Sequence, residues 1–110
     1  MISKDLVAAS SMPLVLSILY SGESYGYAII GAVRELSDYN LNWTDGMLYP
    51  VLHRLEKQGL ISSSWRIADN GRKRKYYGIT ERGKAELERQ KVQWNVVQSA
   101  LDRVWKKLEE

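Results

Sequence analysis

Residues 44–80 read TDGMLYPVLHRLEKQGLISSSWRIADNGRKRKYYGIT, and this stretch decides the fold. Apolar side chains at helical spacing predict a helix from Thr44 to about residue 58, ended by Gly59. The predicted buried face of this helix consists of Leu48, Val51, Leu52 and Leu55. Residues 61–68 and 74–79 alternate like two strands, and the Asp-Asn-Gly run between them predicts a hairpin turn. If Thr44 caps the helix, Pro50 must kink it; if Gly46 does, the proline costs little.

Two further helices are predicted upstream. Residues 5–20 are too long and too apolar for a strand, which predicts a helix buried on more than one side and either bent at Pro13 or regular only from there. Ser24 is the predicted N-cap of a second helix that ends near residue 37. Its predicted buried positions are Tyr25, Ile29, Ala32, Val33 and Leu36. Gly26 and Gly31 are unfavourable inside a helix and indicate close backbone approach.

The final predicted helix begins after Thr80 as its N-cap and reaches about Leu108, a length of about 40 Å. The order of elements is three helices, a β-hairpin and this long helix. We therefore expect a mainly α protein with a small β-hairpin. Residues 1–80 form a winged helix-turn-helix domain, and residues 81–110 form a C-terminal dimerisation helix.

Composition excludes several classes of site. The chain has 110 residues, the size of one small domain, with no cysteine and one histidine, His53. Disulfides, thiolate zinc sites and His-rich metal or catalytic centres are therefore excluded, and we expect no cofactor. No signal peptide or membrane-length apolar run is present, so we expect a cytoplasmic protein.

Charge is concentrated in one segment. Residues 61–80 carry five Lys/Arg and one Asp/Glu, whereas residues 1–60 carry four and six. Such a basic patch is typical of a surface that binds a polyanion, although a solvated charged loop is the simpler alternative. A helix-turn-helix followed directly by a basic hairpin favours double-stranded DNA, with the third helix in the major groove. The predicted DNA contacts are Thr44, Asp45, Met47, Tyr49, Pro50, His53, Arg54, Lys57, Arg72, Lys73, Arg74, Lys75 and Tyr76. Alternation along the return strand places Tyr77 in the core and leaves Tyr76 exposed.

The residues are less consistent with two other function classes, a protein–protein adaptor and an enzyme. A winged helix that binds only proteins usually lacks a cationic hairpin, and residues 72–75 are four consecutive Lys/Arg. An enzyme would need a competent site built from one histidine and scattered carboxylates, and no such pair is evident. We therefore expect a regulator that binds DNA, with the protein–protein adaptor as the alternative.

The last helix carries an apolar seam in which leucine or tryptophan recurs every seven residues, with a second position three residues later. This seam is longer than one small domain can cover, so we expect a homodimer. The predicted interface is Leu87, Trp94, Val97, Leu101, Val104, Trp105 and Leu108. Trp94 and Val97 could also hold a flat apolar ligand at a two-fold axis, while interface packing alone is the simpler reading.

Three runs resemble the PadR family of bacterial transcriptional regulators: SYGYAI, GMLYPVLHRLEKQGLI and GRKRKYYGIT. The resemblance covers nearly the whole chain, and the short form with one long C-terminal helix resembles the smaller PadR subfamily. The hairpin and the position of Trp94, fourteen residues after Thr80, are similar to those of a multidrug-binding regulator in the family. The resemblance implies a dimeric repressor that planar hydrophobic or cationic drugs release from DNA. It places DNA contact on Tyr49, Arg54, Lys73, Arg74 and Lys75, and drug stacking on Trp94.

Overall fold

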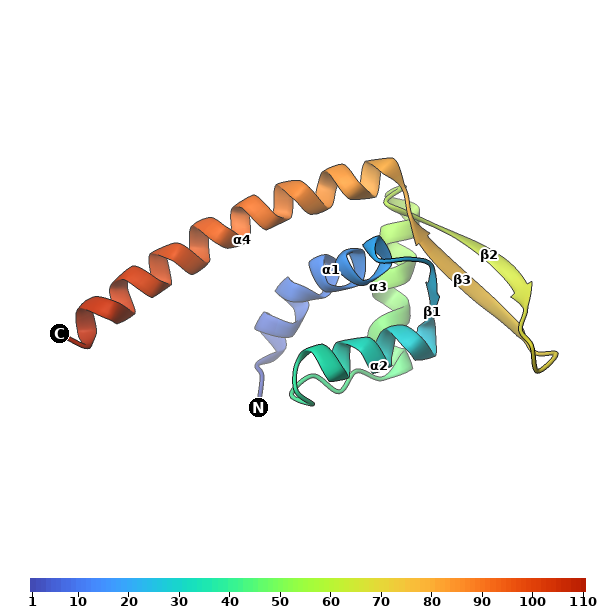
Figure 1. Cartoon of the computed structure of the whole chain (residues 1–110), viewed down its shortest axis with the longest axis horizontal. Coiled ribbons are helices and arrows are strands. Elements are labelled where there is room, and N and C mark those ends of the chain that lie inside the picture. The colour runs from blue at the N-terminus through green and yellow to red at the C-terminus, as the bar shows by residue number, and fades with distance from the viewer.

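The computed structural model describes residues 1–110 and contains four helices and a three-stranded antiparallel sheet. In chain order the elements are α1 (Lys4–Tyr20), β1 (Ser24–Tyr25), α2 (Gly26–Leu36), α3 (Asp45–Lys57), β2 (Ile61–Ile67), β3 (Lys73–Ile79) and α4 (Glu81–Leu108). The predicted fold class is confirmed. Helices α1, α2 and α3 pack together with the sheet at one side, and α4 runs past α1 and out beyond the body (Figure 1).

The core explains why these helices form. Its buried side chains come from every helix and from the inner ends of β2 and β3. All four predicted core positions of α3 are buried, and α1 buries side chains on more than one side, as expected. Leu36, also predicted to be buried, is instead 70% exposed because α2 ends there and nothing packs over it.

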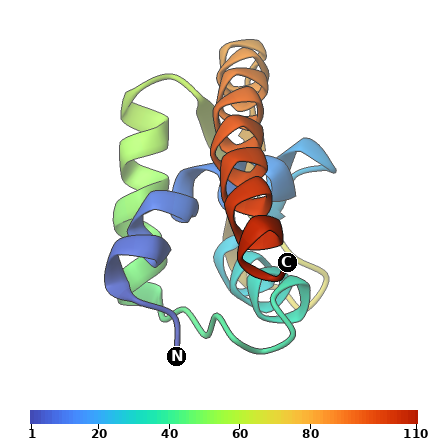
Figure 2. The ribbon, with the colours of Figure 1, turned by 90° about the vertical axis from the view of Figure 1, so that its left-hand side faces the viewer.

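Both prolines lie inside helices. Helix α1 runs continuously through Pro13, and its axis changes direction partway along (Figure 1 and Figure 2). A proline lacks the N–H of the helical ladder and crowds the preceding turn, which bends a helix without ending it when both sides are packed. In α3 the N-cap is Thr44, so Pro50 lies within the helix rather than in its first turn.

The second helix begins differently from the prediction. Ser24 does not cap α2; it pairs with Tyr77, and Tyr25 pairs with Tyr76, which adds β1 to the sheet in the order β1-β3-β2. The helix starts at Gly26, with Tyr25 at the N-cap and no side-chain cap hydrogen bond. Two paired residues have no periodicity of their own, so only the neighbouring strand makes them β.

The hairpin and the long helix follow the prediction. Gly71 has φ +80°, and Ala68 N–H donates to the Arg72 carbonyl oxygen at 2.8 Å, which closes a three-residue turn. Thr80 Oγ1 caps α4 by accepting from Gly83 N–H at 3.0 Å. The 28 residues of α4 span about 42 Å, and residues 91–110 are all exposed. This projection gives a radius of gyration of 15.9 Å, against about 13 Å for a compact domain of this length.

Candidate nucleic-acid interface

The exposed surface of α3 divides into three strips around its buried face. Asp45 and Tyr49 lie on the flank toward the sheet, where Glu56 contacts β2 and β3. Pro50, His53 and Lys57 lie opposite the buried face, as helical geometry requires. Met47 and Arg54 lie on the other flank and line a cavity shared with α1. The predicted DNA-contact residues of α3 are therefore all exposed, but they do not share one direction.

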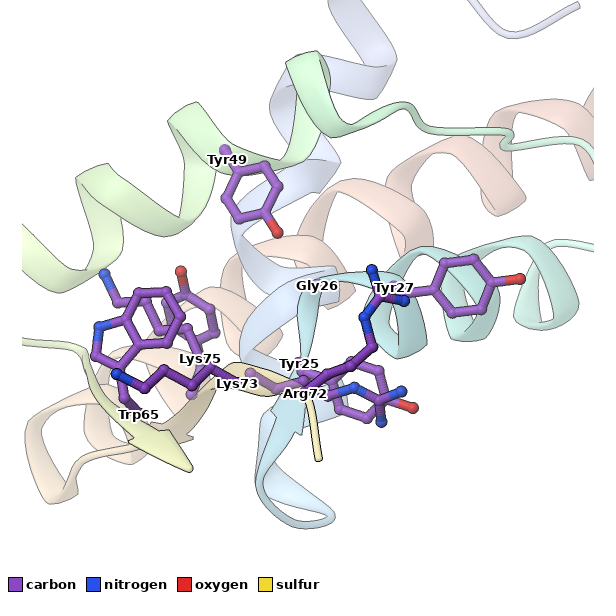
Figure 3. A pocket seen from close by; sticks show the side chains of 10 residues that line it. Tyr25, Gly26, Tyr27, Tyr49, Trp65, Arg72, Lys73 and Lys75 are labelled. Carbon is purple, nitrogen blue, oxygen red and sulfur yellow. The ribbon is translucent and has the colours of Figure 1, made fainter. Parts of the chain in front are cut away.

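Tyr49 is positioned by a glycine. An added Cβ on Gly26 would lie 2.6 Å from the Tyr49 hydroxyl oxygen, so a larger residue would displace the ring from this position. Figure 3 shows the phenol pointing from α3 toward Gly26 at the start of α2. Gly26 is thus closely packed, but by a side chain rather than by the backbone approach that was predicted. The same prediction was wrong for Gly31, where an added Cβ would meet nothing within 4 Å.

We call the hairpin of residues 61–79 the wing, and its two faces differ. Lys73 and Lys75 lie on the face toward α3, beside their strand partners Ile67 and Trp65. The base of the wing is fastened to α3 through Glu56, which accepts a hydrogen bond from Ser63 at 2.5 Å and pairs with Lys75 at 4.0 Å. Lys75 is therefore partly neutralised within the chain, whereas Lys73 makes no ion pair.

The opposite face of the wing holds a stack of cations and tyrosines. The Arg74 guanidinium lies 4.4 Å from the centre of the Tyr25 ring, and Arg66 lies 5.0 Å from that of Tyr76. Tyr25 and Tyr76 pack edge to face at 5.4 Å. Tyr76 was predicted to be exposed; it is instead half-buried in this stack, because β1 pairs beside it on β3. Its aromatic neighbours hold it to the sheet, away from α3.

The wing, α2 and α3 border a cleft with a volume of 730 Å³, which we call the wing cleft. It is lined by Tyr25, Gly26, Tyr27, Tyr49, Trp65, Arg72, Lys73, Arg74, Lys75 and Tyr77 (Figure 3). Four cationic residues line it, with Arg74 at its edge beside Tyr25, and no carboxylate lines it. The start of α2, which has no side-chain cap, faces the same space and leaves backbone N–H groups for an anion.

Five of these lining residues were not predicted as site residues, namely Tyr25, Gly26, Tyr27, Trp65 and Tyr77. Tyr27 is 83% exposed and Trp65 is 65% exposed, and such high exposure is unusual for large aromatic side chains. Tyr27 follows the close-packing glycine directly, which was the available signal. Tyr77, by contrast, is buried as predicted. Burial raises the pKa of its phenol above the usual 10.0, and the nearby Tyr49 and Glu56 add to the rise.

The predicted seam on α4 separates into a buried start and an exposed remainder. Leu87 was assigned to the dimer interface, but it is 4% exposed and belongs to the core of its own chain. Trp94 lies against α1, where Ser10, Pro13, Leu14 and Ser17 complete a shallow cavity of 220 Å³. The exposed residues of the predicted seam beyond it are Val97, Leu101, Val104, Trp105 and Leu108.

Other kinds of site are not evident. No group of three or more His, Asp or Glu side chains is placed to hold a metal ion. No helix is long and apolar enough to cross a membrane. A helix-turn-helix joined to a cationic wing, with both on one concave surface, defines the winged helix-turn-helix class of proteins.

Comparison with known proteins agrees with this class. The profile of the transcriptional regulator PadR-like family matches residues 15–89, and the chain belongs to that family. The chain is 30% identical over 88 residues to the transcriptional regulator YqjI of Escherichia coli, covering 80% of this chain and 41% of that protein. A transcriptional regulator from Clostridium thermocellum has a similar structure, with a TM-score of 0.82 at 28% identity, covering 91% of this chain and 97% of that one. A PadR family transcriptional regulator from Eggerthella lenta gives 0.76 at 33% identity, covering 91% and 85%. A second relative, 46% identical over 54 residues and covering 49% of this chain and 50% of that protein, is the transcriptional regulator Rv3488 of Mycobacterium tuberculosis.

Proposed function

We propose that this chain is a sequence-specific DNA-binding repressor that acts as a homodimer. The observation that carries the proposal is the wing cleft, where the recognition helix α3 and four cationic residues line one concave surface. Helix α3 enters the major groove and the wing contacts the flanking backbone or minor groove. The protein acts on DNA in the cytoplasm.

The proposed DNA contacts follow from where each side chain lies on α3 or on the wing. Tyr49, His53 and Lys57 reach the groove from α3, and Arg72 and Lys73 reach phosphates from the wing. Lys73 has no partner within the chain, so its charge is available to a phosphate. Lys75 first has to leave Glu56, and Arg74 has to leave the Tyr25 ring. The other predicted DNA contacts of α3 border the residues that reach the groove. They are Thr44, Asp45, Met47, Pro50 and Arg54.

The homodimer is proposed from α4. Apolar side chains in the stripe from Trp94 to Leu108 are between 37% and 78% exposed, although a monomer rarely leaves so continuous an apolar surface uncovered. Packed on a second copy, this stripe forms a helical seam and joins two DNA-binding parts. In this dimer residues 1–80 of each copy bind DNA, and residues 81–110 fix the distance between the two DNA-binding parts. This distance must match half-sites about 34–36 Å apart.

The regulating ligand is proposed at the same helix. Trp94 is 37% exposed beside α1, and Val97 follows one turn later, so a planar hydrophobic or cationic molecule can stack there between two copies. This matches the resemblance to drug-binding members of the smaller PadR subfamily. A ligand that changes the angle of α4 changes the half-site separation, and thereby relieves repression.

The test is fluorescence anisotropy of the purified chain with its own upstream DNA and with a scrambled duplex, at several salt concentrations. Preference for the upstream DNA by about 10³-fold, with a steep fall of affinity with salt, is the expected result. Binding to neither duplex at low salt would refute DNA contact by the wing and favour the adaptor. Repression itself is read from a reporter under the same upstream DNA.

A further inference from the structure

A second concave site lies on the side of α3 away from the wing. It has a volume of 510 Å³, within the range of small-molecule sites, and sits between the N-terminal half of α1 and α3. We call it the α1–α3 cavity. Val7, Ser11 and Val51 form its inner wall, and Lys4 and Arg54 also line it. Neither the wing nor Trp94 takes part in it.

A residue that lines this cavity carries an unsatisfied donor. Trp43 is 4% exposed, and its indole N–H has no hydrogen-bond partner. Buried polar groups are nearly always paired in native domains, so an orphaned donor on a residue that lines a cavity points to a missing acceptor. The nitrogen is enclosed, so an acceptor reaches it only when a neighbouring side chain shifts. Met47 lines the same cavity, is 43% exposed and is flexible enough to move.

The charges and shape of the cavity define the ligand. Lys4 and Arg54 make no ion pair within the chain, and no carboxylate lines the cavity. An anionic group is therefore complementary to it. Planar aromatic molecules are held best between two rings, but Trp43 is the only ring lining this cavity, and the other apolar walls are aliphatic. A flexible aliphatic body fits them better.

We propose that the α1–α3 cavity binds a small amphipathic anion, a medium-chain carboxylate in its chemistry, whose oxygen pairs with the Trp43 indole N–H. Arg54 belongs to this cavity and to the proposed DNA-binding surface of α3, so the bound anion competes with DNA. This second step rests on the proposed function, whereas anion binding does not.

The indole N–H signals of the four tryptophans provide a direct assay by ¹H–¹⁵N correlation NMR on the full chain. Trp43 is assigned from the signal lost in Trp43→Phe. Titration with sodium decanoate should move the Trp43 indole signal downfield, as a new hydrogen bond requires, and leave Trp94 nearly unchanged. Decanol, which has the same chain without the charge, should bind more weakly.

Two neighbouring alanines supply matched variants. Ala8 lines the cavity and Ala9 does not, and both are exposed on α1. Ala8→Phe fills the cavity and should weaken decanoate binding by at least about tenfold, while Ala9→Phe should bind as the parent does. Lys4→Glu reverses a charge in the cavity and should weaken decanoate severalfold without affecting decanol.

Several results would overturn the proposal. Equal affinity in Ala8→Phe and Ala9→Phe, or movement of the Trp94 signal in place of Trp43, would put the ligand elsewhere. No response at all would mean that a second copy or the chain itself fills the cavity. Decanoate should also weaken DNA binding in the parent and in Ala9→Phe, but not in Ala8→Phe. A Trp43 shift in a chain that binds no DNA would keep the anion site and refute only the proposed function.

Discussion

Replacing Gly83 by alanine should destabilise the protein, although the same change at Gly31 should stabilise it. Gly83 lies in the first turn of α4, where an added Cβ would overlap the Leu60 carbonyl oxygen and lie 2.8 Å from Ile79 Cγ1. The Leu60 oxygen also accepts from Thr80 N–H at 3.0 Å, the bond that joins the N-cap of α4 to the residue just before β2. Backbone atoms cannot yield as a flexible side chain can, so α4 must move.

The expected loss of stability in Gly83→Ala is the sum of the interactions that the added methyl group disturbs. Overpacking costs about 1–3 kcal/mol, and weakening the Thr80 to Leu60 hydrogen bond about 1–3 kcal/mol. The better helix propensity of alanine returns about 1 kcal/mol. The net loss is about 3 kcal/mol, or roughly 15 °C in Tm for a domain of this size. At Gly31, where nothing lies within 4 Å of an added Cβ, only the gain of about 1 kcal/mol remains.

The assay is urea unfolding followed by far-ultraviolet circular dichroism, at one fixed protein concentration because association shifts the midpoint. Both variants should keep the parent m-value, with the midpoint lowered in Gly83→Ala and raised in Gly31→Ala. If Gly83→Ala matched the parent, α4 would not be docked on Leu60 as described. Its angle to the wing, on which the proposed half-site separation depends, would then be set elsewhere.

Three further outcomes are expected. Lys73→Ala should weaken binding to all DNA sequences and lower the slope of log K against log salt by about 1, and an unchanged slope in the anisotropy series would exclude a phosphate contact there. Trp94→Ala should abolish binding of a planar dye while circular dichroism stays the same, and retained dye affinity would rule out stacking on that ring. Since the Tyr77 pKa is raised in the folded chain, the unfolded chain loses this proton first; stability should fall as pH rises above 10.0, and Tyr77→Phe should lessen that fall in urea unfolding. Equal alkaline slopes in parent and variant would contradict the burial of the phenol.

Much of the candidate site follows from residue order alone. The turn around Gly71, the cap at Thr80 and the buried stripe of α3 depend on neighbours within a few residues, and each was predicted. The basic segment of the wing is also visible in the sequence, because four cations in a row remain together whatever the fold. The strip of α3 on which Arg54 lies could not be assigned, because that depends on the position of α1.

The sequence by itself thus determined the helices α1, α3 and α4, the hairpin and the location of positive charge, because side-chain period and turn chemistry act over short distances. Only the tertiary structure decided that Ser24 pairs with β3, that Tyr76 packs on Tyr25, that Leu87 enters the core and that Trp43 lacks a partner. Each of these depends on a contact between segments far apart in the chain. Local periodicity shows which face of an element is apolar, but the neighbour that covers it is chosen by packing of the whole domain.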